Sequence, residues 1–145
     1  MTLRWGNRAA GIVLVARSTG NVLFLLRSLD VNEGGTWGIP GGKVDHGENA
    51  RTSAVRELEE ETGYGDDVNV LAEPIHRYEE PGFEFLTYFG YVEDEFEPEL
   101  NWESDDYRWS PVTRVPKPTH PGVVEMLGKR RKAIAAEIRK IRSLP

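Results

Sequence analysis

The sequence contains no cysteine, which excludes disulfide bonds, thiolate zinc sites, iron–sulfur clusters and cysteine nucleophiles. It also has no apolar run of the roughly 18 residues that a membrane-spanning helix requires, so no membrane contact is expected. Basic residues are scarce relative to acidic ones, 18 against 24, and the net charge is −6. Because sequence-independent binders of duplex DNA usually carry the opposite charge balance, duplex DNA binding is not expected either.

The chain has 145 residues, which is enough for one ordinary domain and too few for two cores of normal size. We therefore expect residues 1–145 to form a single domain. Hydrophobic residues make up 39% and charged residues 29%, as is typical of globular proteins. The short apolar stretch near the N-terminus is not followed by a small-residue cleavage site. Together with the missing cysteines, this predicts a cytoplasmic protein.

Runs of apolar, β-branched and aromatic residues predict strands, and clusters of Gly, Pro, Asn and Asp between them predict turns. The first two runs are separated by the polar residues 18–21, which favours a hairpin. Residues 29–47 are rich in Gly, Asn and Asp and are predicted to be a loop. The expected strands are Ala9–Ala16, Val22–Arg27, Val68–Tyr78, Phe83–Val92 and the short Tyr107–Ser110.

Two segments have the periodicity of helices. In Asn49–Thr62, Ala50, Ala54 and Leu58 recur at every fourth residue, and Gly63 follows as a stop signal. Pro121–Arg142 repeats apolar residues at helical spacing as well. A sheet accompanied by one central and one C-terminal helix predicts an α/β domain.

The central helix carries a notable acidic face. Glu57, Glu60 and Glu61 stand at positions i, i+3 and i+4, which places their Cβ atoms about 5–6 Å apart on one face. Like charges at these spacings repel one another, so a compensating cation is expected. Carboxylate oxygens suit Mg²⁺ or Mn²⁺. The alternative interpretation is a solvated acidic face that binds no metal.

The segment from Gly42 to Tyr64 reads GKVDHGENARTSAVRELEEETGY. It resembles the Nudix box, Gly-x5-Glu-x7-Arg-Glu-U-x-Glu-Glu-x-Gly-U, where U is a bulky aliphatic residue, of the MutT-like Nudix hydrolases. Every fixed position matches, and the one departure is Tyr64, an aromatic residue at the last aliphatic position. A looser similarity covers most of residues 8–115, including the lead-in at 37–42 and Glu103 ahead of Trp109.

The resemblance implies an α/β/α sandwich with a mixed β-sheet, in which the box forms a loop, a helix and a second loop. It also implies a site for Mg²⁺ or Mn²⁺. The implied metal ligands are three carboxylates and one backbone carbonyl, those of Glu57, Glu60, Glu61 and Gly42. Glu48 and Arg56 are expected to form an ion pair that holds the loop against the helix, and Gly63 is expected to be structural.

The family reaction is the hydrolysis of a nucleoside diphosphate linked to another group X, which releases a nucleoside monophosphate or its equivalent. Phosphoryl transfer requires positioning and charge neutralisation rather than a protein nucleophile. The general base varies across the family, and here Glu57, Glu60 and Glu103 are candidates, with Asp105 and Asp106 as neighbouring competitors. The residues expected to be catalytic are Glu57, Glu60, Glu61 and Glu103.

The partner implied by the resemblance is a small nucleotide substrate. Arg27 at a strand end and His46 in the box loop are candidates for phosphate binding, although a surface ion pair and an exposed loop histidine are the simpler alternatives. Four aromatic residues are candidates for base stacking or for core packing: Trp37, Phe83, Phe85 and Tyr88. Extra signatures of other Nudix subfamilies are not clearly met, so (d)NTPs and nucleotide sugars such as ADP-ribose both stay open.

Two further functions remain as alternatives. One is a non-catalytic Nudix-fold domain that binds nucleotides, although such domains usually lose box glutamates and all are present here. The other is an RNA 5′-end pyrophosphohydrolase, in which the basic segment 129–132 (KRRK) contacts RNA instead of forming a solvated helix face. The sequence does not distinguish a monomer from a homodimer.

Overall fold

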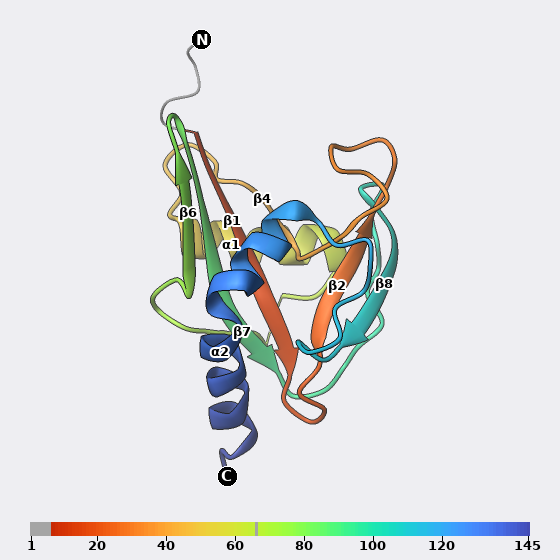
Figure 1. Cartoon of the computed structure of the whole chain (residues 1–145), viewed down its shortest axis with the longest axis vertical. Coiled ribbons are helices and arrows are strands. Elements are labelled where there is room, and N and C mark those ends of the chain that lie inside the picture. Colours follow the sequence, from red (N-terminus) through yellow and green to blue (C-terminus); the bar gives the residue numbers. More distant parts are fainter. Residues whose placement is uncertain (1–6, 66) are drawn as a thin grey trace.

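The computed structural model describes residues 7–65 and 67–145. It is a mixed β-sheet with one helix on each face, as expected for an α/β/α sandwich (Figure 1). The first six residues, which belong to the segment considered for a leader, lie outside the described residues. Within the described part, neither helix has the length and apolar character needed to cross a membrane.

Strands β1 (Asn7–Ala16) and β7 (Phe83–Val92) form the centre of the sheet. They pair in parallel along their whole length, from Asn7 opposite Phe83 to Ala16 opposite Val92. Because successive side chains of a strand point to opposite faces, β1 supplies both cores. Val13 and Val15 pack on the α2 side, and Ile12 and Leu14 pack on the α1 side.

Strand β2 (Val22–Arg27) meets β1 only where Val15 lies opposite Val22. From there the two strands diverge, and β2 pairs along its other edge with β8 (Ser104–Ser110) (Figure 1). Two short strands fill the resulting wedge: β3 (Trp37–Gly38) pairs with β2, and β4 (Gly41–Lys43) pairs with β1. The prediction of an uninterrupted loop over residues 29–47 is therefore wrong at these positions.

On the other side of β7, the single strand predicted for Val68–Tyr78 is two strands. These are β5 (Asn69–Val70) and β6 (His76–Glu80), both antiparallel to β7. Pro74 lies between them and cannot donate a backbone hydrogen bond to a ladder, which accounts for the break. The last strand begins at Ser104, three residues before the predicted start, because the end of β2 continues the ladder to that point.

Both predicted helices are confirmed, as α1 (Ala50–Thr62) and α2 (Pro121–Arg142). The Asn49 side chain accepts a hydrogen bond from the backbone N–H of Thr52, which caps α1 at its start. Gly63 ends the helix in the left-handed conformation, at φ 75°, where its N–H bonds the carbonyl of Glu59. Ala50, Ala54 and Leu58 bury the inner face of α1 against the sheet.

Candidate active site

Of the three glutamates implied as metal ligands, two turn inward, toward the wedge between β1 and β2. Glu61 is only 7% exposed, and the side chain of Glu57 is 12% exposed. Glu57 lies directly against the backbone of β4: a Cβ placed on Gly42 would be 2.5 Å from the carboxyl carbon of Glu57. Only glycine leaves this space, so the first box residue and the first box glutamate of α1 are packed together.

Burial disfavours the ionised form of these two carboxyl groups. Loss of water contact, reinforced by Glu57 and by the charge of Glu103, raises the pKa of Glu61 to about 9. Burial also raises the pKa of Glu57, although Glu61 and Arg56 partly offset this effect. Two neighbouring buried carboxyl groups of this kind can bind a proton or a cation, and a cation would remove the cost of ionising both.

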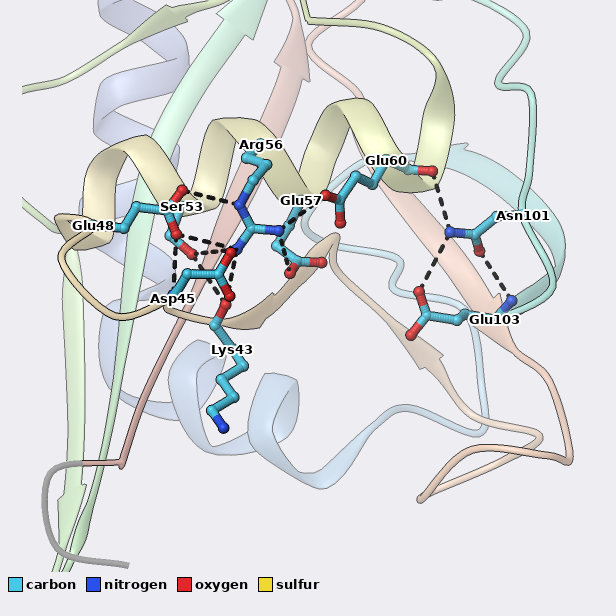
Figure 2. A network of polar contacts seen from close by, with 9 residues as sticks. All are labelled: Lys43, Asp45, Glu48, Ser53, Arg56, Glu57, Glu60, Asn101 and Glu103. Carbon is cyan, nitrogen blue, oxygen red and sulfur yellow. Dashed lines mark hydrogen bonds and ion pairs between the residues drawn. The ribbon is translucent and has the colours of Figure 1, made fainter.

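Arg56 is the centre of a polar network that joins the box loop to α1 (Figure 2). Its Nε donates to Glu48 Oε2 at 2.9 Å, and its Nη2 donates to Glu48 Oε1 at 3.1 Å. The second of these nitrogens also reaches the carbonyl of Lys43 at 3.0 Å. This paired contact lowers the pKa of Glu48 and ties the loop to the helix.

The remaining nitrogen of Arg56 faces the acidic residues. Nη1 lies 3.2 Å from Glu57 Oε2 and 3.0 Å from Glu60 Oε2. The Glu60 side chain is 53% exposed and is held by this ion pair rather than turned inward with Glu57 (Figure 2). The guanidinium group therefore supplies the positive charge that offsets repulsion along the acidic face.

Glu103 approaches the acidic face from a different part of the chain. Asn101 Nδ2 donates to the backbone carbonyl of Glu60 at 3.1 Å and to Glu103 Oε1 at 3.3 Å, so one amide joins the two segments (Figure 2). Sequence reasoning did not single out Asn101, because an asparagine in an acidic loop carries no motif. Asp105 and Asp106, the competitors of Glu103, are both exposed.

The donors fit a divalent cation in chemistry, since they are hard carboxylate and carbonyl oxygens. The close packing of Glu57 on Gly42 also places two of the four implied ligand residues side by side. Among residues 7–65 and 67–145, however, no three acidic or histidine side chains are arranged to hold a metal ion as they stand. Glu60 would have to exchange its ion pair with Arg56 for a bond to the metal.

A cleft of about 1040 Å³ opens beside this acidic face. Gly42 and Glu103 line one part of its wall, and so does Arg27, whose guanidinium donates to the carbonyl of Asn32 at 2.8 Å. His120, which caps the start of α2, also lines the cleft. His46 is exposed and, among the described residues, does not belong to the cleft wall, so the structure does not bring it together with Arg27.

The aromatic residues divide between core and cleft. Trp37 and Tyr88 are buried in the two cores, whereas Phe83 and Phe85 line the cleft. Tyr64, the departure from the box pattern, stacks on Phe96 with ring centroids 4.2 Å apart and planes 12° apart. An aromatic partner at Phe96 thus accommodates an aromatic residue where an aliphatic one is usual.

The basic segment of α2 is largely occupied by intramolecular contacts. Lys129 pairs with Glu125 at 3.2 Å, Arg130 donates to His76 at 3.2 Å, and Arg131 donates to the carbonyl of Val112. Three of the four cations of segment 129–132 therefore already have partners within the chain, while Arg139, Lys140 and Arg142 extend the same basic helix end.

Known proteins are similar to this chain in sequence and in fold. The model of the NUDIX domain matches residues 6–128. A protein of Mycobacterium tuberculosis named "Putative 8-oxo-dGTP diphosphatase 3" is 33% identical over 128 residues, covering 81% of this chain and 59% of the relative. An RNA pyrophosphohydrolase of Erythrobacter litoralis is 38% identical over 74 residues, or 51% of this chain and 42% of the relative. The chain thus spans well under two thirds of the length of these relatives.

Solved structures agree on the fold. A Nudix hydrolase from M. smegmatis superposes with a TM-score of 0.76 at 24% identity, covering 92% of this chain and 87% of that one. An Ap4A hydrolase from C. elegans gives a TM-score of 0.70 at 22% identity, covering 89% of this chain and 98% of that one. With a complete box on α1, a family model over most of its length and this sandwich fold, the chain belongs to the Nudix family.

Proposed function

We propose that this chain hydrolyses a pyrophosphate bond in a nucleoside diphosphate linked to another group, with Mg²⁺ or Mn²⁺ as cofactor. The observation that carries the proposal is the pair of buried carboxyl groups of Glu57 and Glu61, of which Glu57 packs on Gly42 beside a cleft of about 1040 Å³. Burying two carboxyl groups so close together destabilises a fold unless they bind something positive. A domain that needed α1 only for packing would gain nothing from these two buried carboxyl groups.

Glu57, Glu60, Glu61 and the carbonyl of Gly42 are the proposed metal ligands. Bound there, a divalent ion would neutralise charge on the pyrophosphate oxygens and acidify a water molecule. Arg56 holds Glu57 and Glu60 in place through Nη1 while its other nitrogens anchor the box loop through Glu48. Its role is to position ligands, since among the described residues it is not part of the cleft wall and reaches that wall only through the carbonyl of Lys43.

Glu103 is the proposed general base. It lines the cleft, and its carboxylate is oriented by Asn101, which also binds the backbone of α1 at Glu60. Glu57 and Glu61 are less suited to accept a proton from water, because their oxygens are needed as ligands. Arg27 is the proposed contact for a substrate phosphate, as its guanidinium is fixed by Asn32 at the edge of the same cleft.

Two substrate classes remain, (d)NTPs and nucleotide sugars. The name of the M. tuberculosis relative supports a purine nucleoside triphosphate, and we propose that class first. The name of the E. litoralis relative raises the possibility of RNA 5′ ends. The basic segment 129–132 gives that substrate little support, because most of its cations are paired within the chain.

The test is a hydrolysis screen of the purified protein, read by chromatography of the products, with (d)NTPs, nucleotide sugars, dinucleoside polyphosphates and triphosphorylated RNA. Each substrate is assayed with Mg²⁺, with Mn²⁺ and with EDTA. We expect metal-dependent cleavage of one class, and its loss in Glu57→Gln. A folded protein that binds metal but cleaves none of these substrates would overturn the proposal in favour of a binding domain.

A further inference from the structure

The far part of the cleft lies between the sheet and the first turns of α2. Its floor is made of same-face residues of neighbouring strands, because Tyr78 lies opposite Phe85 and Ala9 also lies opposite Phe85. The Phe85 ring lies over Gly11: a Cβ on that glycine would come within 3.0 Å of the ring. Phe85 is half-buried and so presents part of its aromatic ring to the cleft.

One buried histidine at this end belongs to no motif. His76, at the start of β6, is 5% exposed and bonds residues of α2 through both of its ring nitrogens. Its Nε2 lies 2.8 Å from Glu125 Oε1, and its Nδ1 lies 3.2 Å from Arg130 Nε. A guanidinium can only donate hydrogen bonds, so Nδ1 accepts and the proton of the neutral ring is on Nε2. His76 therefore donates to Glu125.

Glu125 is consequently a fixed and charged acceptor at the cleft wall. Partial burial alone would raise the pKa of Glu125, but the hydrogen bonds from His76 and Lys129 lower this pKa below its usual value. One carboxylate offers about four acceptor positions, of which His76 and Lys129 occupy two. Glu125 also lines the cleft, and its side chain is 28% exposed. Neither the box nor the proposed hydrolysis gives this buried arrangement a function.

We propose that this end of the cleft holds the nucleobase of the substrate, with its ring against Phe85, and that Glu125 selects a base with two adjacent N–H donors, as guanine has. This inference rests on the proposed function only in taking the ligand to be a nucleotide. His76 is a positioning residue, because it holds Glu125 in place through Nε2.

The chemistry of the bases makes the selection specific. Guanine presents N1–H and the 2-amino group side by side, so the two can donate to one carboxylate as a charge-assisted pair. Hypoxanthine lacks the 2-amino group and loses one of these bonds. Cytosine offers a single amino group beside an acceptor nitrogen, which a carboxylate repels. The same edge is present in 8-oxoguanine, so Glu125 would accept both forms of the base.

The test measures binding of the products dGMP, dIMP and dCMP to the metal-free protein by calorimetry in EDTA. Because nothing is hydrolysed in this experiment, its outcome is independent of the metal site. We expect dGMP to bind about tenfold or more tightly than dIMP, as befits one lost hydrogen bond to a charged group, and dCMP to bind more weakly still. Equal binding of the three, or no binding of dGMP, overturns the proposal.

Variants then assign the preference to Glu125. Glu125→Gln keeps the side-chain size but replaces one acceptor oxygen by a donor, so the preference for dGMP over dIMP should vanish. A glutamine amide can pair with adenine instead, and binding of dAMP should improve relative to dGMP. Glu137→Gln is the matched control, since Glu137 lies on the same helix but pairs with Lys140. A preference that survives in Glu125→Gln refutes the assignment, and the comparison of dGMP with dIMP in the unmodified protein stands even if that variant does not fold.

Discussion

Removing divalent metal and raising the pH from 6 to 8 should destabilise this protein through Glu61. The pKa of Glu61 is about 9 in the folded protein, against 4.5 for an ordinary glutamate. Between these values the folded state retains a proton that the unfolded state has lost, so stability falls as the pH rises. Each pH unit in this window lowers the free energy of unfolding by up to about 1.4 kcal/mol, which amounts to about 3 kcal/mol from pH 6 to pH 8. That corresponds to a fall in Tm of roughly 10 °C.

The assay is thermal unfolding at pH 6, 7 and 8, in EDTA and in saturating Mg²⁺. A bound metal ion replaces the proton, so the Tm with Mg²⁺ should fall less and the gain from Mg²⁺ should widen with pH. Glu61→Gln removes the titrating group, and its Tm in EDTA should stay nearly constant across the series. If the unmodified protein and Glu61→Gln lost the same Tm in EDTA, the reasoning from burial would be refuted.

Three more substitutions probe the site and its support. In Gly42→Ala the added methyl group would displace the carboxyl group of Glu57, so kcat should fall by about 100-fold while the protein still folds. In Glu60→Gln one anionic ligand is lost, and kcat with Mg²⁺ should also fall by at least about 100-fold, with little change in stability because its ion pair is exposed. Tyr64→Leu restores the usual aliphatic residue but loses stacking on Phe96, so urea denaturation should show a loss of about 1 kcal/mol.

The chain offers matched controls for these variants. Gly128→Ala introduces a methyl group on α2 where nothing lies within 4 Å, so kcat should be unchanged. Glu59→Gln removes an exposed carboxylate from the same helix as Glu60 and should retain normal turnover. Normal turnover in Gly42→Ala or Glu60→Gln would contradict the ligand assignment, and an unchanged stability of Tyr64→Leu would show that the ring stacking contributes nothing.

Local signals determined which parts of the fold could be predicted. Helix α1 was predictable because its cap Asn49, its stop Gly63 and its apolar spacing all lie within one short segment. Strands β3 and β4 were not, because they are only two and three residues long and glycine makes up at least half of each. They become strands only through the wedge left where β2 diverges from β1, and that divergence is a property of the whole sheet.

The site divides in the same way. The acidic face of α1 could be predicted from helical spacing alone. Which of its glutamates are buried could not, because the burial of Glu61 and the exposure of Glu60 depend on how α1 packs against β4. His76 and Glu125 are 49 residues apart in sequence, and nothing near either one marks them as partners. Spacing within a helix can be read from sequence, whereas pairs that form when separate elements pack together cannot.

The two-residue strand β3 has a mechanical consequence. Trp37 accepts a hydrogen bond from the backbone of His120 and donates one to Pro118, so the segment that begins α2 is fastened to the strand that leads into the box. The box with its acidic face and the helix that borders the far end of the cleft are therefore both connected to β3. The position of β3 therefore fixes the distance between the two ends of the cleft. A shift in β3 would change kcat and KM together.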